Sequence, residues 1–375
     1  MRTTTHFPVF LFIILSGFLT SCEIDNEIEE ISKDPEFSKK KVELKKTLPA
    51  PKRFLALDTE KLEEDNIREN LRNSLSIHAL DDESCLPSEL TPILLQHLAK
   101  LASDPLAEDY FNVYTNLSLM MATSDRSEQY FGAEGEYTSL MNRRIRELER
   151  FWNMPGALRV NGQHSESLND REKLATLYFM LSQDESSWEM AYEAADEILA
   201  LNARSASLPE SIFFSLDGLL NFANTIVIGD GLVQVLSETG IDPKIIYSAI
   251  LSHEWAHQIQ LDYFESWYPG VNPYGADRPG LQLELEADFF SAYFLTHKRG
   301  AAYNWKRIEE FLDLSFTLGD CSTTSPLHHG TPAQRMRASR QGYELAMAAQ
   351  KKGHILTPEE VHQAFVKALP EILQP

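Results

Sequence analysis

Apolar residues recur at helical spacing along most of the chain, which predicts a mostly helical protein. Leucines follow Thr91-Pro92 at this spacing, and a threonine before a proline is typical of a helix start. Thr357-Pro358-Glu359-Glu360 is a capping box that opens the last predicted helix. Between these two signals, the pattern predicts helices over 140–152, 170–182, 187–201, 243–261 and 281–298, and another that starts at Thr331-Pro332.

The period changes near the middle of the chain, where the residues become apolar and β-branched. Residues 211–216 and 225–228 each predict a strand, and Gly229-Asp230-Gly231 is a turn signal directly after the second. Residues 157–160 predict a further short strand. The predicted fold class is therefore α+β, mostly helical, with a small sheet.

The N-terminus has the pattern of an export signal. Arg2 precedes an apolar run over 7–19, which is too short for a transmembrane helix and fits a cleaved signal peptide. Leu19-Thr20-Ser21-Cys22 follows and resembles the lipobox of bacterial lipoproteins. In such signals the cysteine becomes the acylated first residue, so the resemblance implies an envelope protein with a palmitate-type lipid anchor on Cys22. An ordinary signal peptide with an incidental cysteine is the alternative.

The domain plan follows from these patterns. Residues 1–22 form the signal peptide, and 23–75 are highly charged with little apolar periodicity, as expected of a flexible tether. An N-terminal helical region over 76–205 precedes a core over 206–375 that includes the C-terminal helices.

Charge and cysteine content narrow the function classes. The chain of 375 residues has a formal net charge of −22, which disfavours binding to nucleic-acid phosphates. Of three cysteines, Cys85 and Cys321 remain if Cys22 is acylated. In an oxidising compartment these two cysteines either pair in a disulfide or stay as separate thiols.

The predicted helix over 243–261 contains His253-Glu254-Trp255-Ala256-His257, an HExxH sequence. Residues i and i+4 project from one face of a helix, so both imidazoles reach a single zinc ion. Glu254 is rotated about 100° from His253 around the helix axis, beside the metal, where a general base is needed. Two surface histidines on an ordinary helix are the alternative.

A second helix, over 281–298, supplies the missing ligand. A catalytic zinc site uses three protein ligands and water, and Glu284 is the predicted third ligand. Asp288 lies on the same helical face as Glu284 and is the predicted partner of a histidine ring, most simply His253. Glu286 is the competing ligand, and it points about 200° away from Glu284.

HExxH followed by ExxAD resembles the gluzincin metallopeptidases of the M48 type and the related neutral zinc metallopeptidases. The segments Asn221-Phe222-Ala223, 225–232 and 329–337 resemble conserved parts of these families, so the resemblance covers roughly 211–345. It implies a zincin-like metallopeptidase core that binds one Zn²⁺ ion.

The same resemblance implies how a polypeptide substrate binds and reacts. The substrate would pair with an edge strand formed by Thr225, Ile226, Val227 and Ile228. Glu254 would serve as the general base, and the oxyanion donor would be His329, with His328 as the second candidate and Arg335 as the third. Arg335 alternatively braces a helix or pairs with an acid.

Residues 262–280 lie between the two metal-bearing helices and contain Tyr263, Phe264, Trp267, Tyr268 and Tyr274. These aromatic residues either form a lid over the cleft or cover a hydrophobic core. The predicted function is a zinc-dependent endopeptidase that acts on envelope or extracytoplasmic proteins. The alternative is a metal-containing envelope chaperone or scaffold lipoprotein without significant peptidase activity.

Overall fold

The computed structural model describes residues 90–181, 187–221, 223–273, 279–318, 329–352 and 354–374. Several of the predicted features lie outside these residues. They are the signal peptide, the 23–75 tether, Cys22, Cys85, Phe222, Tyr274, Cys321 and His328. Within the described residues, no helix is both long and apolar enough to cross a membrane.

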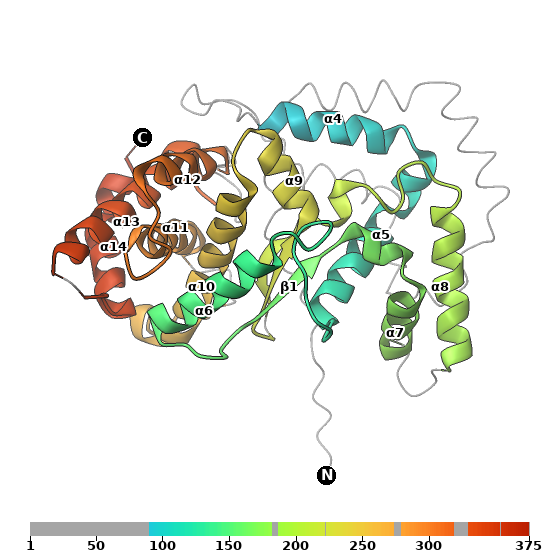
Figure 1. Cartoon of the computed structure of the whole chain (residues 1–375), viewed down its shortest axis with the longest axis horizontal. Helices are drawn as coiled ribbons and strands as arrows, with labels where there is room; N and C mark the ends of the chain where they lie inside the picture. The colour runs from blue at the N-terminus through green and yellow to red at the C-terminus, as the bar shows by residue number, and fades with distance from the viewer. Residues whose placement is uncertain are drawn as a thin grey trace, which may run out of the picture.

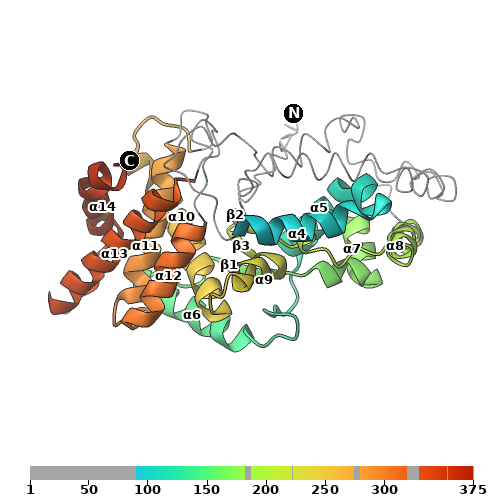
Figure 2. The same cartoon turned by 90° about the horizontal axis from the view of Figure 1, so that it is seen from above.

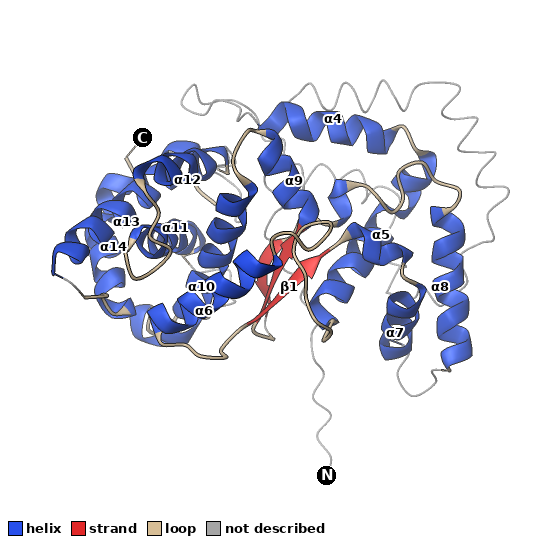
Figure 3. Ribbon diagram, in the orientation of Figure 1, coloured by secondary structure: helices blue, strands red, loops and turns tan. Residues whose placement is uncertain are grey.

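The described chain is mostly helical with one small sheet, as the sequence predicts (Figure 3). Its α-helices are α4 Leu90–Ala102, α5 Pro105–Ser124, α6 Thr138–Trp152, α7 Arg171–Leu181, α8 Trp188–Asn202, α9 Asp230–Glu238, α10 Pro243–Trp267, α11 Gly280–Thr296, α12 Trp305–Thr317, α13 Pro332–Lys352 and α14 Pro358–Ile372. Helix α10 runs six residues beyond its predicted end. Helices α5, α9 and α12 were not predicted. Thr91-Pro92 was predicted to start a helix, but α4 begins one residue earlier, at Leu90.

The sheet has three strands, β1 Arg159–Gln163, β2 Gly218–Asn221 and β3 Thr225–Gly229, in the order β1-β3-β2. Strand β3 pairs with β1 in parallel and with β2 in antiparallel orientation. The strand predicted over 211–216 is wrong. Residues Ile212–Phe214 form a short 3₁₀ helix, which starts where the Ser211 hydroxyl accepts a hydrogen bond from the Phe213 N–H. All three residues of this turn are buried, so a continuous apolar run did not distinguish it from a strand.

The order of the sheet also corrects the predicted edge strand. Thr225, Ile226, Val227 and Ile228 lie in β3, which has a hydrogen-bonded neighbour on each side and is fully buried. In the described sheet the two edges are β1 and β2. The sequence could not reveal this, because β1 pairs in parallel with a strand more than sixty residues further along the chain.

The sheet and α10 lie in the middle of the molecule, between two groups of helices. Figure 1 shows α11 to α14 at one end and α4, α5, α7 and α8 at the other, and the view from above agrees (Figure 2). One hydrophobic core runs through the described residues from Leu90 to Ile372. Residues on both sides of the boundary predicted near residue 205 contribute to this core, and β1, from the N-terminal side, pairs with β3 in the sheet.

Candidate metal centre

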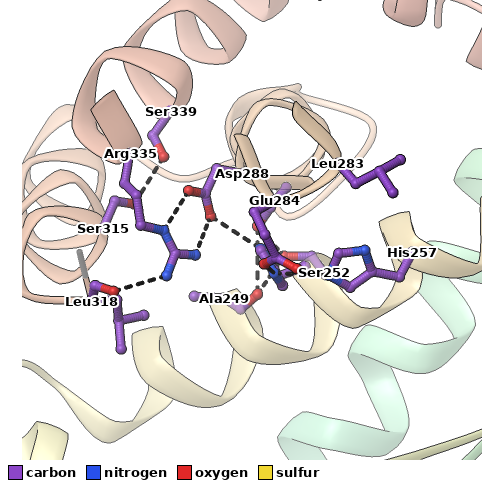
Figure 4. Close-up of polar contacts among 12 residues, drawn as sticks. Ala249, Ser252, His257, Leu283, Glu284, Asp288, Ser315, Leu318, Arg335 and Ser339 are labelled. Carbon is purple, nitrogen blue, oxygen red and sulfur yellow. Dashed lines mark hydrogen bonds and ion pairs between the residues drawn. The ribbon is translucent and has the colours of Figure 1, made fainter. Parts of the chain in front are cut away.

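Helices α10 and α11 carry the candidate ligands and are held close together. Helix α10 begins after Asp242, whose side chain accepts a hydrogen bond from the Lys244 N–H, and Pro243 occupies its first turn. Where the two helices cross, Ser252 Oγ lies 2.6 Å from Ser291 Oγ. These small hydroxyl side chains let the helices approach, so that the ligands of both helices face a common point (Figure 4).

His253, His257 and Glu284 form the candidate metal site. Their nearest donor atoms all lie within 4.8 Å of one another, and no other such group of three occurs among the described residues. The two Nε2 atoms are 3.2 Å apart, and Glu284 oxygens lie 3.4 Å from His253 Nε2 and 3.7 Å from His257 Nε2.

This spacing fits a tetrahedral zinc ion. Ligands about 2.0–2.1 Å from a tetrahedral centre are roughly 3.3 Å from each other, close to the three distances in the site. Two imidazole nitrogens and one carboxylate oxygen are also a donor set that zinc accepts. The three side chains are 12–14% exposed, so the site is sheltered but reachable from solvent.

Asp288 occupies the place that the sequence predicts for it. Its Oδ1 lies 3.0 Å from His253 Nδ1, which leaves His253 Nε2 directed toward Glu284. Arg335 of α13 donates to both Asp288 oxygens, each at 2.8 Å, and to the Leu318 carbonyl at 3.0 Å. Arg335 thus pairs with an acid, one of the alternatives given for it above. Its guanidinium is already hydrogen-bonded to Asp288 and to the Leu318 carbonyl.

The electrostatics of the ligands show a site that favours positive charge. Burial alone would lower the pKa of His253, but hydrogen bonds to Asp288 and Glu284 outweigh it and raise this pKa to about 10. Burial opposes ionisation of Glu284 as well, yet the nearby His257 and His253 hold its pKa well below the usual range. A carboxylate that stays ionised in a buried place, next to two imidazoles, is suited to a cation.

Glu254 lies beside these ligands and not among them. It is 3% exposed, lines the same pocket as His253 and Glu284, and is hydrogen-bonded by the backbone of Leu220 in β2. Burial raises the pKa of Glu254 to about 8, so this carboxylate takes up a proton near neutral pH. A cation in the site would lower this pKa again.

Glu286, the competing ligand, faces away from the site. It is fully buried, and its two oxygens lie 2.6 Å from His362 Nδ1 and 3.1 Å from Gln260 Nε2. The helical rotation of about 200° between Glu284 and Glu286 sends the second carboxylate toward α14. Gln260 and His362 were not singled out in the sequence, which offers no periodic signal for either.

The remaining candidates divide between the pocket and the core. His329 is buried and lines the same pocket as His253, Glu284 and Glu254. Phe264 and Trp267 lie on the last turns of α10, where Phe264 is buried and Trp267 stacks on His362 at a ring distance of 4.0 Å. These two aromatic residues therefore cover the core and do not form a lid. Tyr263 is 39% exposed.

An apolar wall completes the pocket and was not predicted. It is built by helices α9 and α12, which the sequence pattern did not reveal, and by the α10 turn before His253. The side chains that form it are Leu232, Leu236, Ala249, Ile250, Phe311 and Leu314. The site thus joins a polar, ligand-bearing side to an apolar side.

Comparisons with models of protein families, with curated proteins and with solved structures find no match for this chain. The likeness to M48-type peptidases therefore depends on the motifs quoted above. To those motifs the structure adds a His-His-Glu group, spaced as in HExxH…E, in a mostly helical α+β fold.

Proposed function

We propose that the protein is a zinc-dependent endopeptidase of the bacterial cell envelope. One observation carries the proposal: His253, His257 and Glu284 converge at zinc-binding distances, with the buried carboxylate of Glu254 in the same pocket. A bound zinc ion would polarise the scissile carbonyl and lower the pKa of a coordinated water to about 7.

The chain's own residues supply the proton transfers and the orientation. Glu254, whose carboxylate lines the same pocket as the metal ligands, accepts the proton of the attacking water and delivers it to the leaving amine. Asp288 keeps the Nδ1 side of His253 occupied and so aims Nε2 at the site. His329, in the wall of the same pocket, is the proposed donor to the developing oxyanion.

An extended polypeptide is the proposed substrate, bound along β2. This strand is an edge of the described sheet and contacts Glu254 through the backbone of Leu220. Strand addition would hold the peptide by its backbone, next to the general base. A substrate side chain near the scissile bond would enter the apolar side of the pocket, beside Gly218 at the start of β2.

Envelope location and membrane attachment belong to the same proposal and depend on the sequence. Leu19-Thr20-Ser21-Cys22 supports export and acylation at Cys22, which would tether the folded body to a membrane surface. Polypeptides exposed in the envelope are then the substrates within reach.

The test is the Glu254→Gln substitution, with Glu265→Gln as the matched control on an exposed turn of the same helix. Hydrolysis of a peptide library should fall by about 10²–10⁴-fold in Glu254→Gln, with zinc content unchanged, and should stay at the wild-type rate in Glu265→Gln. An equal rate in wild type and Glu254→Gln would refute the general base. Zinc binding without hydrolysis in the wild type would favour the alternative, a metal-containing chaperone or scaffold.

A further inference from the structure

A buried hydrogen-bonded chain reaches His257 from the C-terminal helix. His257 Nδ1 lies 2.8 Å from Gln260 Oε1, one turn further along α10. The Gln260 amide nitrogen donates to the Leu283 carbonyl at 2.8 Å and to Glu286 Oε2 at 3.1 Å. Because both acceptors lie on the nitrogen side, the amide has one favourable orientation, with its oxygen facing the imidazole.

The far end of this chain is anchored in α14. Glu286 Oε1 lies 2.6 Å from His362 Nδ1, and neither side chain is more than 6% exposed. The His362 ring stacks on Trp267, whose indole N–H donates to Glu359 at 2.6 Å. Five side chains from α10, α11 and α14 thus fix one another, namely Gln260, Glu286, His362, Trp267 and Glu359, with the ligand His257 at the inner end.

The direction of these hydrogen bonds determines which nitrogen of His257 can act as a metal ligand. An amide oxygen can only accept, so Nδ1 of His257 must carry the proton and Nε2 keeps its lone pair. That lone pair is on the side of His253 Nε2 and Glu284. The two histidines differ in this respect, since His253 has a carboxylate partner in Asp288 while His257 has a neutral amide.

We propose that Gln260 is the positioning residue of His257, and that Glu286 and His362 hold its amide so that α14 contributes to metal affinity. The inference rests on the proposed metal site but not on peptidase activity. A buried carboxylate such as Glu286 is costly unless it is hydrogen-bonded, and here both of its oxygens are used in this chain. Glu286 lies two residues after Glu284 on α11, so the helix that carries the third ligand also helps to position His257.

Gln260→Leu tests the first link, with Gln258→Leu as the matched control. Gln258 is a buried glutamine on the same helix whose amide donates to Asp262 and not to the Gln260–Glu286–His362 contacts. Zinc affinity of the full chain, measured by competition with a chromophoric chelator, should fall about 10–100-fold in Gln260→Leu and less than twofold in Gln258→Leu. Equal affinities of these two variants would overturn the proposal.

A charge-exchange pair separates positioning from a general loss of packing. Gln260→Glu places two carboxylates 3.1 Å apart and should weaken zinc binding. Adding Glu286→Gln returns one donor to the contact, since the new amide can donate to the new carboxylate, and should restore part of the lost affinity. The Leu283 carbonyl, which accepts from Gln260 in the wild type, stays without that donor in both variants. The Co²⁺-loaded chain should show a changed visible absorption in the single variant and a spectrum closer to that of the wild type in the double variant. Failure of the second substitution to restore either quantity would overturn the proposal.

His362→Phe tests the contribution of α14. Phenylalanine keeps a ring against Trp267 but cannot donate to Glu286, so zinc affinity should fall, though by less than in Gln260→Leu. An unchanged affinity would show that α14 does not contribute to zinc binding. If the wild-type chain binds zinc but hydrolyses no peptide, the proposed function fails and this inference stands. If the wild type binds no zinc, both fail.

Discussion

Asp288 Oδ1 lies 3.0 Å from His253 Nδ1, on the side of the imidazole away from the candidate metal. Arg335 donates to both oxygens of the same carboxylate and keeps it ionised, although burial alone would raise the pKa of Asp288. The HExxH helix is therefore connected to α13 through the ion pair between Asp288 and Arg335.

The first prediction concerns this contact. Asp288→Asn should lower zinc affinity about 10–100-fold, because the amide provides no negative charge to His253 and presents N–H groups to Arg335. Chelator competition measures the effect, and Asp313→Asn, on the exposed face of α12, serves as the control. An unchanged affinity in Asp288→Asn would show that His253 needs no carboxylate partner.

The second prediction decides which acid binds the metal. Glu284→Ala removes one of three donors, so zinc measured by elemental analysis after dialysis should fall well below one ion per chain. Glu286→Ala leaves all three donors in place and should retain more zinc than Glu284→Ala under the same conditions. The reverse order of zinc content would make Glu286 the ligand.

The sequence predicted the site better than the fold around it. HExxH and the later carboxylates are fixed by helical geometry, so His253, His257, Glu284 and Asp288 could be placed on common faces before any tertiary structure was known. The pairing of β1 with β3 depends on contacts between distant segments. The pattern of β3 was therefore recognised correctly, but its central position in the sheet was not.

Tertiary contacts also explain what the sequence left out. Gln260 and His362 are polar residues without a periodic pattern, and only the packing of α10, α11 and α14 brings them together with Glu286. The apolar pocket wall arises in the same way, since it combines side chains of α9, α10 and α12. Individual hydrophobic positions on these helices look like ordinary core residues in the sequence.

The third prediction concerns membrane attachment. Cys22→Ala should move the protein from the membrane fraction to the soluble fraction of fractionated cells, because acyl chains would provide the attachment. Cys85→Ala leaves the Leu19-Thr20-Ser21-Cys22 sequence intact and should remain with the membrane. Metabolic labelling with a fatty-acid analogue checks the same point, and a labelled Cys22→Ala protein would contradict acylation at that residue.

The fourth prediction follows from Asp217, a buried acid directly before β2. Gln163 donates to Asp217 Oδ2 at 2.5 Å and accepts from the Asp217 N–H at 3.1 Å, yet burial outweighs this and raises the pKa of Asp217 to about 6. In the unfolded chain this pKa is about 3.9, so the folded state binds the proton more tightly. Asp217 therefore destabilises the fold increasingly as pH rises from about 4 to 6, and its effect is constant above that range.

Asp217→Asn should remove this pH dependence, because an amide stays neutral and its oxygen still accepts from Gln163. The free energy of unfolding of the variant minus that of the wild type should increase by roughly 2 kcal/mol between pH 4.5 and 7.5. Urea unfolding of the metal-free protein at both pH values measures this difference, with Asp313→Asn as an exposed control. A difference that does not change with pH would mean that Asp217 is already ionised in the fold at pH 4.5, in which case Gln163 compensates fully for its burial.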